Sequence, residues 1–180
     1  MKHLTVGSCS FWPHDIYYTS KNVGDSVIAV VLNCGGAKEG YYHECQIDPL
    51  SRDIERARRE GKILLLFQHE PISTGNPADT EVNELWHTAN VDRNFYDAPF
   101  LCGRPGQNDP ATDAVYKLIT ENADVVRGLF CGHYHSAFYM EIQASRPGAD
   151  GERIPAVIPQ YLVVANPCGR CGIVTRIIID

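Results

Sequence analysis

Two continuously apolar runs stand on either side of an amphipathic helical pattern, and few folds accept that order. Ser26 to Asn33, "SVIAVVLN", and Lys62 to Gln68, "KILLLFQ", have the apolar character of strands covered on both faces. Between them, Asp48 to Glu60 repeats apolar residues at helical spacing, is charged elsewhere, and is followed directly by a glycine. Strand, helix and strand in this order predict a βαβ crossover and therefore an α/β fold.

The helix-to-strand order returns further along the chain. Ala111 to Ala123 has apolar residues at helical spacing, and the apolar strand Val125 to Cys131 follows it. Three more strand-like runs come next, "AFYMEIQ", "AVIPQYLVVAN" and "GIVTRIIID". Because their links are short and rich in turn residues, we expect a mixed sheet with antiparallel C-terminal strands. At 180 residues the chain has the size of a single domain, residues 1–180.

Charge and composition exclude several classes of partner. The formal net charge is -6 and the pI is 5.6, whereas a protein that holds nucleic acid through its phosphates needs a basic face. The apolar runs are too short to span a bilayer, and the N-terminus has no sustained apolar segment before a small-residue cleavage site. We therefore expect a cytoplasmic protein without nucleic-acid or membrane partners. A small phosphorylated substrate fits this charge if a metal ion supplies the positive charge.

The cysteines indicate a reducing environment. Seven is an odd number in a chain without a secretory signal, so reduced thiols are favoured over a disulfide framework. Four of them are expected to pack as small buried apolar groups: Cys34, Cys45, Cys102 and Cys131.

Three histidines follow the C-terminal ends of predicted strands. His69 comes directly after "KILLLFQ", and His133 and His135 lie in "FCGHYHS". Ligands collect at this end of the strands in α/β sheets, so the three imidazoles are expected to converge. Neutral imidazole is the commonest nitrogen ligand of transition metals, and Gly132 lets the backbone turn tightly before the pair. The alternative is that all three are ordinary polar residues of loops and strand ends.

The order of these motifs resembles that of a known enzyme family. "GHYH" followed by an aromatic-rich strand, and preceded by "HEP" at the end of an apolar strand, resembles the last two metal motifs of the calcineurin-like metallophosphoesterases. The flanks are similar too: "YYTSKNVGDSVIAVVLN" resembles the family's strand before the helix, and "ECQIDPLSRDIERARREGKILLLFQHEP" its helix and strand leading to the metal histidine. The resemblance covers roughly residues 15 to 180.

This resemblance implies a fold, a reaction and a set of ligands. The family's fold is a β-sandwich flanked by helices, with the metals at strand ends, and its reaction is phosphoester hydrolysis by a metal-bound hydroxide. In a two-metal centre, His69 and His133 would be ligands of one metal and His135 of the other, with manganese, iron or zinc as the ions. The partner would be a small phosphoester substrate.

The family's upstream motifs are absent from the sequence. It contains no D-x-H, no G-D-x-x-D and no G-N-H. Gly24-Asp25 stands just before the strand that resembles the one following those motifs in the family, so it is not assigned as the bridging aspartate. Two dications about 3.5 to 4 Å apart need negative charge that imidazoles do not supply. We therefore expect one metal ion or none, assign no catalytic residue, and interpret the chain as the C-terminal half of a phosphoesterase domain, either truncated or without its chemistry.

The alternative, from another class of function, is a non-catalytic remnant that serves as a binding or oligomerisation module. Half a sheet would expose an unpaired edge and an apolar surface, so such a chain is expected to form a homodimer through that edge.

Three further motifs admit a functional and a simpler interpretation. Cys168 and Cys171 in "PCGRCG" could be half of a zinc site or a redox pair, but a turn between antiparallel strands is simpler because no second pair exists. Cys131 with His133 could form a nucleophile and base, although neighbouring strand-end residues point to opposite faces. Aromatic residues of the loop-rich region 71–109 could form a substrate lid or simply pack the loop: Trp86, His87, Tyr96 and Phe100.

Overall fold

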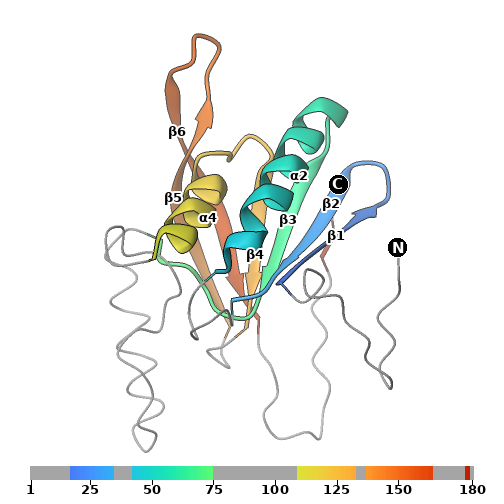
Figure 1. The fold of residues 1–180 in the computed structure, drawn as a ribbon, viewed down its shortest axis with the longest axis vertical. Helices are drawn as coiled ribbons and strands as arrows, with labels where there is room; N and C mark the ends of the chain where they lie inside the picture. Colours follow the sequence, from blue (N-terminus) through green and yellow to red (C-terminus); the bar gives the residue numbers. More distant parts are fainter. Residues whose placement is uncertain (1–16, 35–41, 75–108, 133–136, 164–176, 179–180) are drawn as a thin grey trace, which may run out of the picture.

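The computed structural model describes residues 17–34, 42–74, 109–132, 137–163 and 177–178 of the chain. Nine elements follow one another in these ranges (Figure 1): β1 Tyr18–Val23, β2 Val27–Leu32, the 3-10 helix η1 Glu44–Gln46, α2 Ile47–Glu60, β3 Ile63–Gln68, α4 Pro110–Thr120, β4 Val126–Cys131, β5 Phe138–Pro147 and β6 Arg153–Leu162.

The strands form one six-stranded mixed sheet in the order β1-β2-β3-β4-β6-β5. Strands β2, β3, β4 and β6 are parallel to one another, while β1 pairs antiparallel with β2 and β5 pairs antiparallel with β6. The predicted α/β fold with antiparallel C-terminal strands is therefore confirmed. Strand β6 lies between β4 and β5, so the last hairpin joins the parallel part of the sheet through its second strand.

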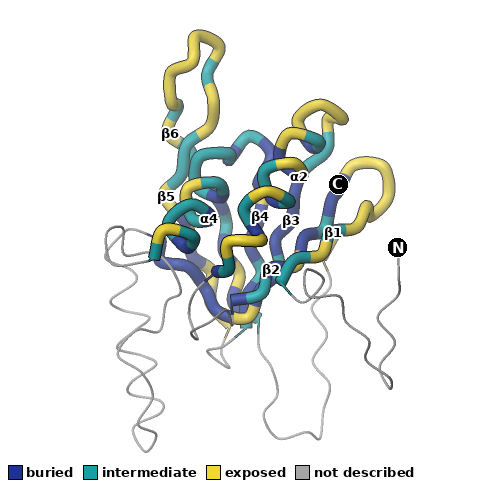
Figure 2. The backbone as a smooth tube through the Cα atoms, viewed as in Figure 1, coloured by how far each residue is buried: buried dark blue, intermediate teal, exposed yellow. Residues whose placement is uncertain are grey.

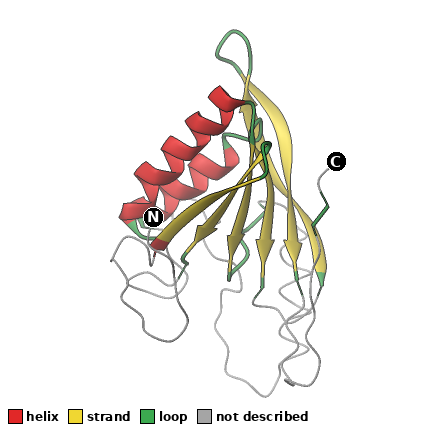
Figure 3. Cartoon of the chain, turned by 90° about the vertical axis from the view of Figure 1, so that its right-hand side faces the viewer, coloured by secondary structure: helices red, strands yellow, loops and turns green. Residues whose placement is uncertain are grey.

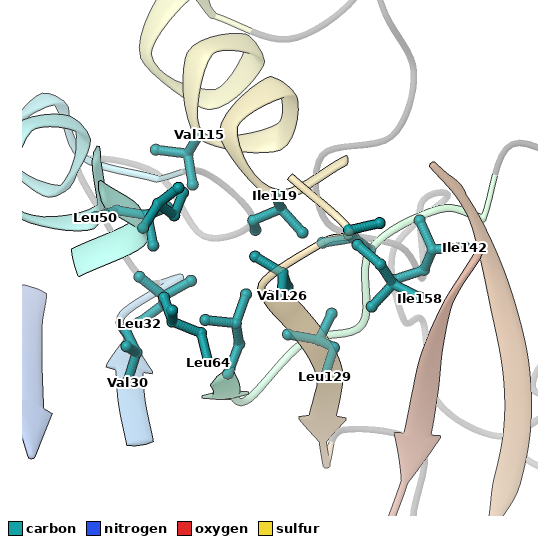
Figure 4. Close-up of a cluster of buried hydrophobic side chains, with 14 of the residues drawn as sticks. Val30, Leu32, Leu50, Leu64, Val115, Ile119, Val126, Leu129, Ile142 and Ile158 are labelled. Carbon is teal, nitrogen blue, oxygen red and sulfur yellow. The ribbon is translucent and has the colours of Figure 1, made fainter. Parts of the chain in front are cut away.

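Helices α2 and α4 cover the same face of the sheet, and no described helix lies on the other face (Figure 3). Side chains that alternate inward from the strands meet the apolar sides of these helices, and the buried, dark blue stretches of the tube in Figure 2 include much of the central strands β2, β3 and β4. The centre of this core consists of fully or almost fully buried side chains (Figure 4): Val30, Leu32, Leu50, Leu64, Val115, Ile119, Val126, Leu129, Ile142 and Ile158.

Local signals fix the ends of both helices. Helix α2 ends at Gly61, whose φ of 65° is left-handed and whose N–H bonds to the Ala57 carbonyl. Helix α4 begins with Pro110 after Asp109, whose carboxylate accepts a hydrogen bond from the Thr112 N–H at 2.8 Å. The predicted helices agree with these bounds to within three residues.

The edge strand β1 was not separated from β2 at the sequence level. Its residues "YTSKNV" are polar and mostly exposed, so they lack the apolar alternation that identifies a strand. The link between the two strands contains Gly24, with a φ of 60°, which supplies the left-handed residue of the hairpin turn.

The cysteine prediction holds for two of the four residues. Cys34 and Cys131 are buried, and both are free thiols. Cys45 is exposed, so that part of the prediction is wrong: its neighbour Gln46 takes the inward position of η1 and is fully buried. Cys102 lies outside the described residues.

Several other predicted segments also lie outside the described residues, including the aromatic residues between 71 and 109, the "PCGRCG" motif and most of "GIVTRIIID". Ile177 and Ile178 of that last run are exposed. None of the helices in the described ranges is both long and apolar enough to cross a bilayer.

Candidate functional site

The carboxyl ends of the parallel strands meet at one edge of the sheet, where α/β proteins place their ligands. Cys34 comes shortly after β2, His69 directly after β3, and Gly132 directly after β4. This edge is where the sequence places its candidate metal ligands.

His69 presents an exposed imidazole beside the end of β4. Its backbone carbonyl accepts a hydrogen bond from the Gly132 N–H at 2.9 Å, which extends the pairing of β3 with β4. A Cβ built on Gly132 would lie 3.5 Å from Nδ1 of His69 and 3.9 Å from Cε1. The imidazole therefore stands in the space that a longer side chain at position 132 would enter.

Gly132 is predicted to let the backbone turn tightly. Among the described glycines, Gly24, Gly61 and Gly151 have a positive φ, and Gly132 does not. The φ of Gly132 is therefore open to other residues, and because residues 133–136 lie outside the described residues, the predicted tight turn stays a prediction. A Cβ at this position would make only an ordinary van der Waals contact with the His69 ring, so the space there admits alanine as well as glycine.

His133 and His135 lie outside the described residues. Among the described residues, no group of three or more His, Cys, Asp or Glu side chains is placed to hold a metal ion. The described part of the chain thus contributes one of the three predicted ligands, His69, and the metal assignment stays a prediction.

The chain beyond His69 is buried, unlike most loops. We call residues Glu70–Thr74 the strap, because they run from the end of β3 to β5 and are buried throughout. The Ile72 side chain is fully buried in the core, and the Thr74 carbonyl accepts a hydrogen bond from the Gln143 N–H of β5 at 3.1 Å. A buried loop needs partners for its backbone polar groups.

Side-chain amides supply several of those partners. Gln160 of β6 accepts from the Ile72 N–H and donates to the Ile72 carbonyl, both at 2.9 Å. Gln68 donates to the Glu70 carbonyl at 2.5 Å and accepts from the Tyr42 hydroxyl at 2.5 Å. These residues were missed at the sequence level. The signal for Gln160 was a polar residue at an inward position of an apolar strand.

Two buried thiols flank the His69 segment. The Cys34 sulfur accepts a hydrogen bond from the Glu70 N–H at 3.3 Å, and the Cys131 thiol donates to Oε1 of Gln160 at 3.7 Å. Burial raises the pKa of the Cys34 thiol and raises that of Cys131 well above its ordinary value, with a smaller contribution from Cys34. Because nucleophilic cysteines react as thiolates, this environment disfavours the hypothesis of Cys131 as a nucleophile.

The sheet face without helices carries a second feature, which we call the aromatic row. Phe67, Phe130 and Tyr161 pair in register across β3, β4 and β6, with ring centroids 5.2 and 5.1 Å apart. Tyr139 of β5 continues the row at 5.4 Å from Tyr161, and Val31 of β2 begins it beside Phe67. Val31 is 48% exposed, Tyr139 58% and Tyr161 38%, so the row is a partly open apolar surface.

A comparison with models of protein families and a search of curated proteins both find no match for this chain.

Proposed function

We propose that this chain carries the histidine-bearing part of a metal-dependent phosphoester hydrolase and binds a divalent cation through His69, His133 and His135. The observation that carries the proposal is the exposed His69 imidazole against Gly132, because that glycine begins the Gly-His-Tyr-His segment. The candidate ligand of β3 and the two candidate ligands after β4 therefore belong to adjacent strand ends.

The resemblance to calcineurin-like metallophosphoesterases supplies the finer fold and the reaction of this proposal. The described sheet, with helices on one face and the aromatic row on the other, would be one layer of the family's β-sandwich. A bound divalent metal supplies Lewis-acid chemistry that lowers the pKa of its water toward 7. Three imidazoles and one water satisfy zinc, whereas manganese and iron favour additional oxygen ligands.

The substrate class follows from the charge of the chain. A net charge of -6 does not attract a phosphate, so the positive charge at the site would come from the metal. A small phosphoester that reaches the sheet edge is the substrate proposed, and neither nucleic acid nor a membrane is proposed as a partner.

Metal binding is tested first, and activity is tested after it. The purified chain would be loaded separately with zinc and manganese, and stoichiometry would be measured by elemental analysis and affinity by calorimetry. We expect about one ion per chain, lost in His69→Ala, His133→Ala and His135→Ala but retained in His3→Ala, which removes a histidine outside the motifs. Zinc binding that survives all three changes would refute the site.

Activity is measured next, with a chromogenic aryl phosphate monoester and the matching diester. Hydrolysis that requires the loaded metal and disappears in His135→Ala supports the enzyme. Metal binding without turnover of either ester would reduce the proposal to a metal site that has lost its chemistry.

A second candidate, an oligomerisation module, is favoured by the aromatic row. Side chains of this size on a sheet face are normally covered, and a second copy of the chain could cover them by sheet-on-sheet packing. Sedimentation velocity would detect the dimer, and Tyr139→Thr should shift it toward monomer because Tyr139 is exposed and its replacement costs the fold little. A wild-type monomer at high concentration would eliminate this candidate.

A further inference from the structure

Gln160 is a polar residue at a position where the sheet otherwise places apolar ones. Its neighbours two residues away on β6, Ile158 and Leu162, are 0% and 2% exposed and face the helices, and Gln160 is itself fully buried. A buried amide is costly unless its polar atoms are hydrogen-bonded. Its hydrogen bonds therefore indicate why it lies there.

The amide of Gln160 pairs with Ile72 in the way a neighbouring strand would. Nε2 donates to the Ile72 carbonyl and Oε1 accepts from the Ile72 N–H, both at 2.9 Å. Oε1 also accepts a weaker bond from the Cys131 thiol at 3.7 Å. One side chain thus satisfies both backbone polar groups at the middle of the strap.

The strap is also held at its two ends. At Glu70, the N–H donates to the Cys34 sulfur and the carbonyl accepts from Gln68, and at Thr74 the carbonyl accepts from the Gln143 N–H of β5. Gln160 is the contact that joins the centre of the strap to β6, the strand beside β4.

This arrangement determines how the chain leaves His69. On one side, the His69 carbonyl is bonded to the Gly132 N–H; on the other, the strap begins at the next residue and is buried at once. The imidazole is exposed, and the direction in which it points depends on the backbone from which it leaves.

We propose that Gln160 is a positioning residue for His69: by clamping Ile72 it fixes the strap and, through it, the backbone that presents the imidazole beside Gly132. The role as a ligand rests on the proposed function; the positioning of the backbone does not. Residues that orient a ligand without touching the metal typically contribute about 10 to 100-fold to its affinity.

Amide hydrogen exchange tests the positioning without any metal. In Gln160→Met, which keeps the side-chain volume and removes both hydrogen bonds, the Ile72 N–H should exchange at least about tenfold faster. The Gly132 N–H should also exchange faster, because its acceptor is the His69 carbonyl. Gln143→Met, the same substitution at an exposed position of β5, serves as the control and should leave both amides protected.

Zinc affinity measured on the same variants tests the consequence for the site. We expect a loss of about tenfold in Gln160→Met and none in Gln143→Met. If the Gly132 amide keeps its protection in Gln160→Met, the positioning is refuted, whatever the metal does. If the wild type binds no zinc, the proposed function fails, and the Gly132 amide still decides whether Gln160 positions His69.

A second variant covers the case in which Gln160→Met does not fold. In Gln160→Glu, a protonated carboxyl can accept from the Ile72 N–H and donate to its carbonyl, whereas the carboxylate cannot donate. After correction for intrinsic exchange, protection of the Gly132 amide should be near wild type at about pH 5 and reduced at about pH 8. Wild-type protection at a pH where NMR shows the carboxyl of this variant to be ionised would overturn the proposal, because a merely space-filling role would give that result.

Discussion

The imidazole of His69 lies against Gly132, at the distance where a single added carbon would touch it. A Cβ at position 132 would stand 3.5 Å from Nδ1 of His69, which is an ordinary van der Waals contact and not an overlap. A branch beyond that Cβ that points toward the ring would enter its volume. Side chains of increasing size at position 132 should therefore displace the His69 ring without removing it.

Substituting Gly132 should therefore separate two outcomes by side-chain size. Gly132→Ala should keep zinc binding within about twofold of wild type, because the methyl group fits and the backbone has no left-handed φ. Gly132→Val should weaken zinc binding by about tenfold or more, because its branches displace the ring. Calorimetric titration measures both, with the melting temperature as the control for folding. Equal binding by the two variants would contradict a role for this contact.

The periodic part of the fold could be predicted from the sequence, and the placement of strands could not. Helix α2 and strand β3 were predicted because helical spacing and a continuous apolar run are local signals. The position of β6 between β4 and β5 depends on pairing between distant segments, such as Leu129 with Gln160, for which the sequence carries no local signal. Hydrophobic periodicity therefore identified the helices and strands better than it identified which strands lie side by side in the sheet.

At the candidate site, too, the local features could be predicted from the sequence and the contacts between distant segments could not. His69 was placed correctly at the carboxyl end of β3, because a strand end is visible in the sequence. Its supporting contacts were not predicted: the two residues of the Gln160–Ile72 pair are 88 positions apart. Cys45 was predicted as buried from its residue type, and the inward position next to it belongs to Gln46.

Glycine at position 61 is predicted to stabilise the fold more than any residue with a side chain would. Its φ of 65° is left-handed, and a Cβ there would meet nothing within 4 Å, so the cost of Gly61→Ala comes from the backbone alone. We expect about 1 to 2 kcal/mol lower free energy of unfolding for Gly61→Ala. Gly61→Asn should lose less, because asparagine tolerates this conformation. Urea unfolding at constant pH distinguishes the two, and equal stability of Gly61→Ala and wild type would argue against the cap.

Tyr18 should make stability depend on alkaline pH. Its hydroxyl donates to the Asp53 carboxylate at 2.6 Å, and burial, followed by this hydrogen bond and the charge of Asp53, raises the pKa of Tyr18 above its ordinary value. Because the native pKa is raised, the stabilisation is complete below the unfolded pKa of about 10 and is lost as pH rises beyond it.

The expected slope is at most about 1.4 kcal/mol per pH unit above that point, and Tyr18→Phe should remove it. Urea unfolding at several pH values from about 9 to 11 measures the difference between variant and wild type. Tyr139→Phe is the control, since Tyr139 is exposed and water screens its hydrogen bond to Glu141. A slope that persists in Tyr18→Phe would assign the alkaline loss to other groups.

The buried hydrogen-bond chain from Tyr42 through Gln68 to the strap is predicted to act as a unit. The Tyr42 hydroxyl donates to Oε1 of Gln68, and Nε2 of Gln68 donates to the Glu70 carbonyl. Tyr42→Phe leaves Oε1 of Gln68 without that donor in a buried position and should cost about 1 to 3 kcal/mol of unfolding free energy. Adding Gln68→Met to Tyr42→Phe should cost less than the two single changes together, because the amide left without its donor is then gone. Additive costs in a double-mutant cycle would mean that the two hydrogen bonds are independent.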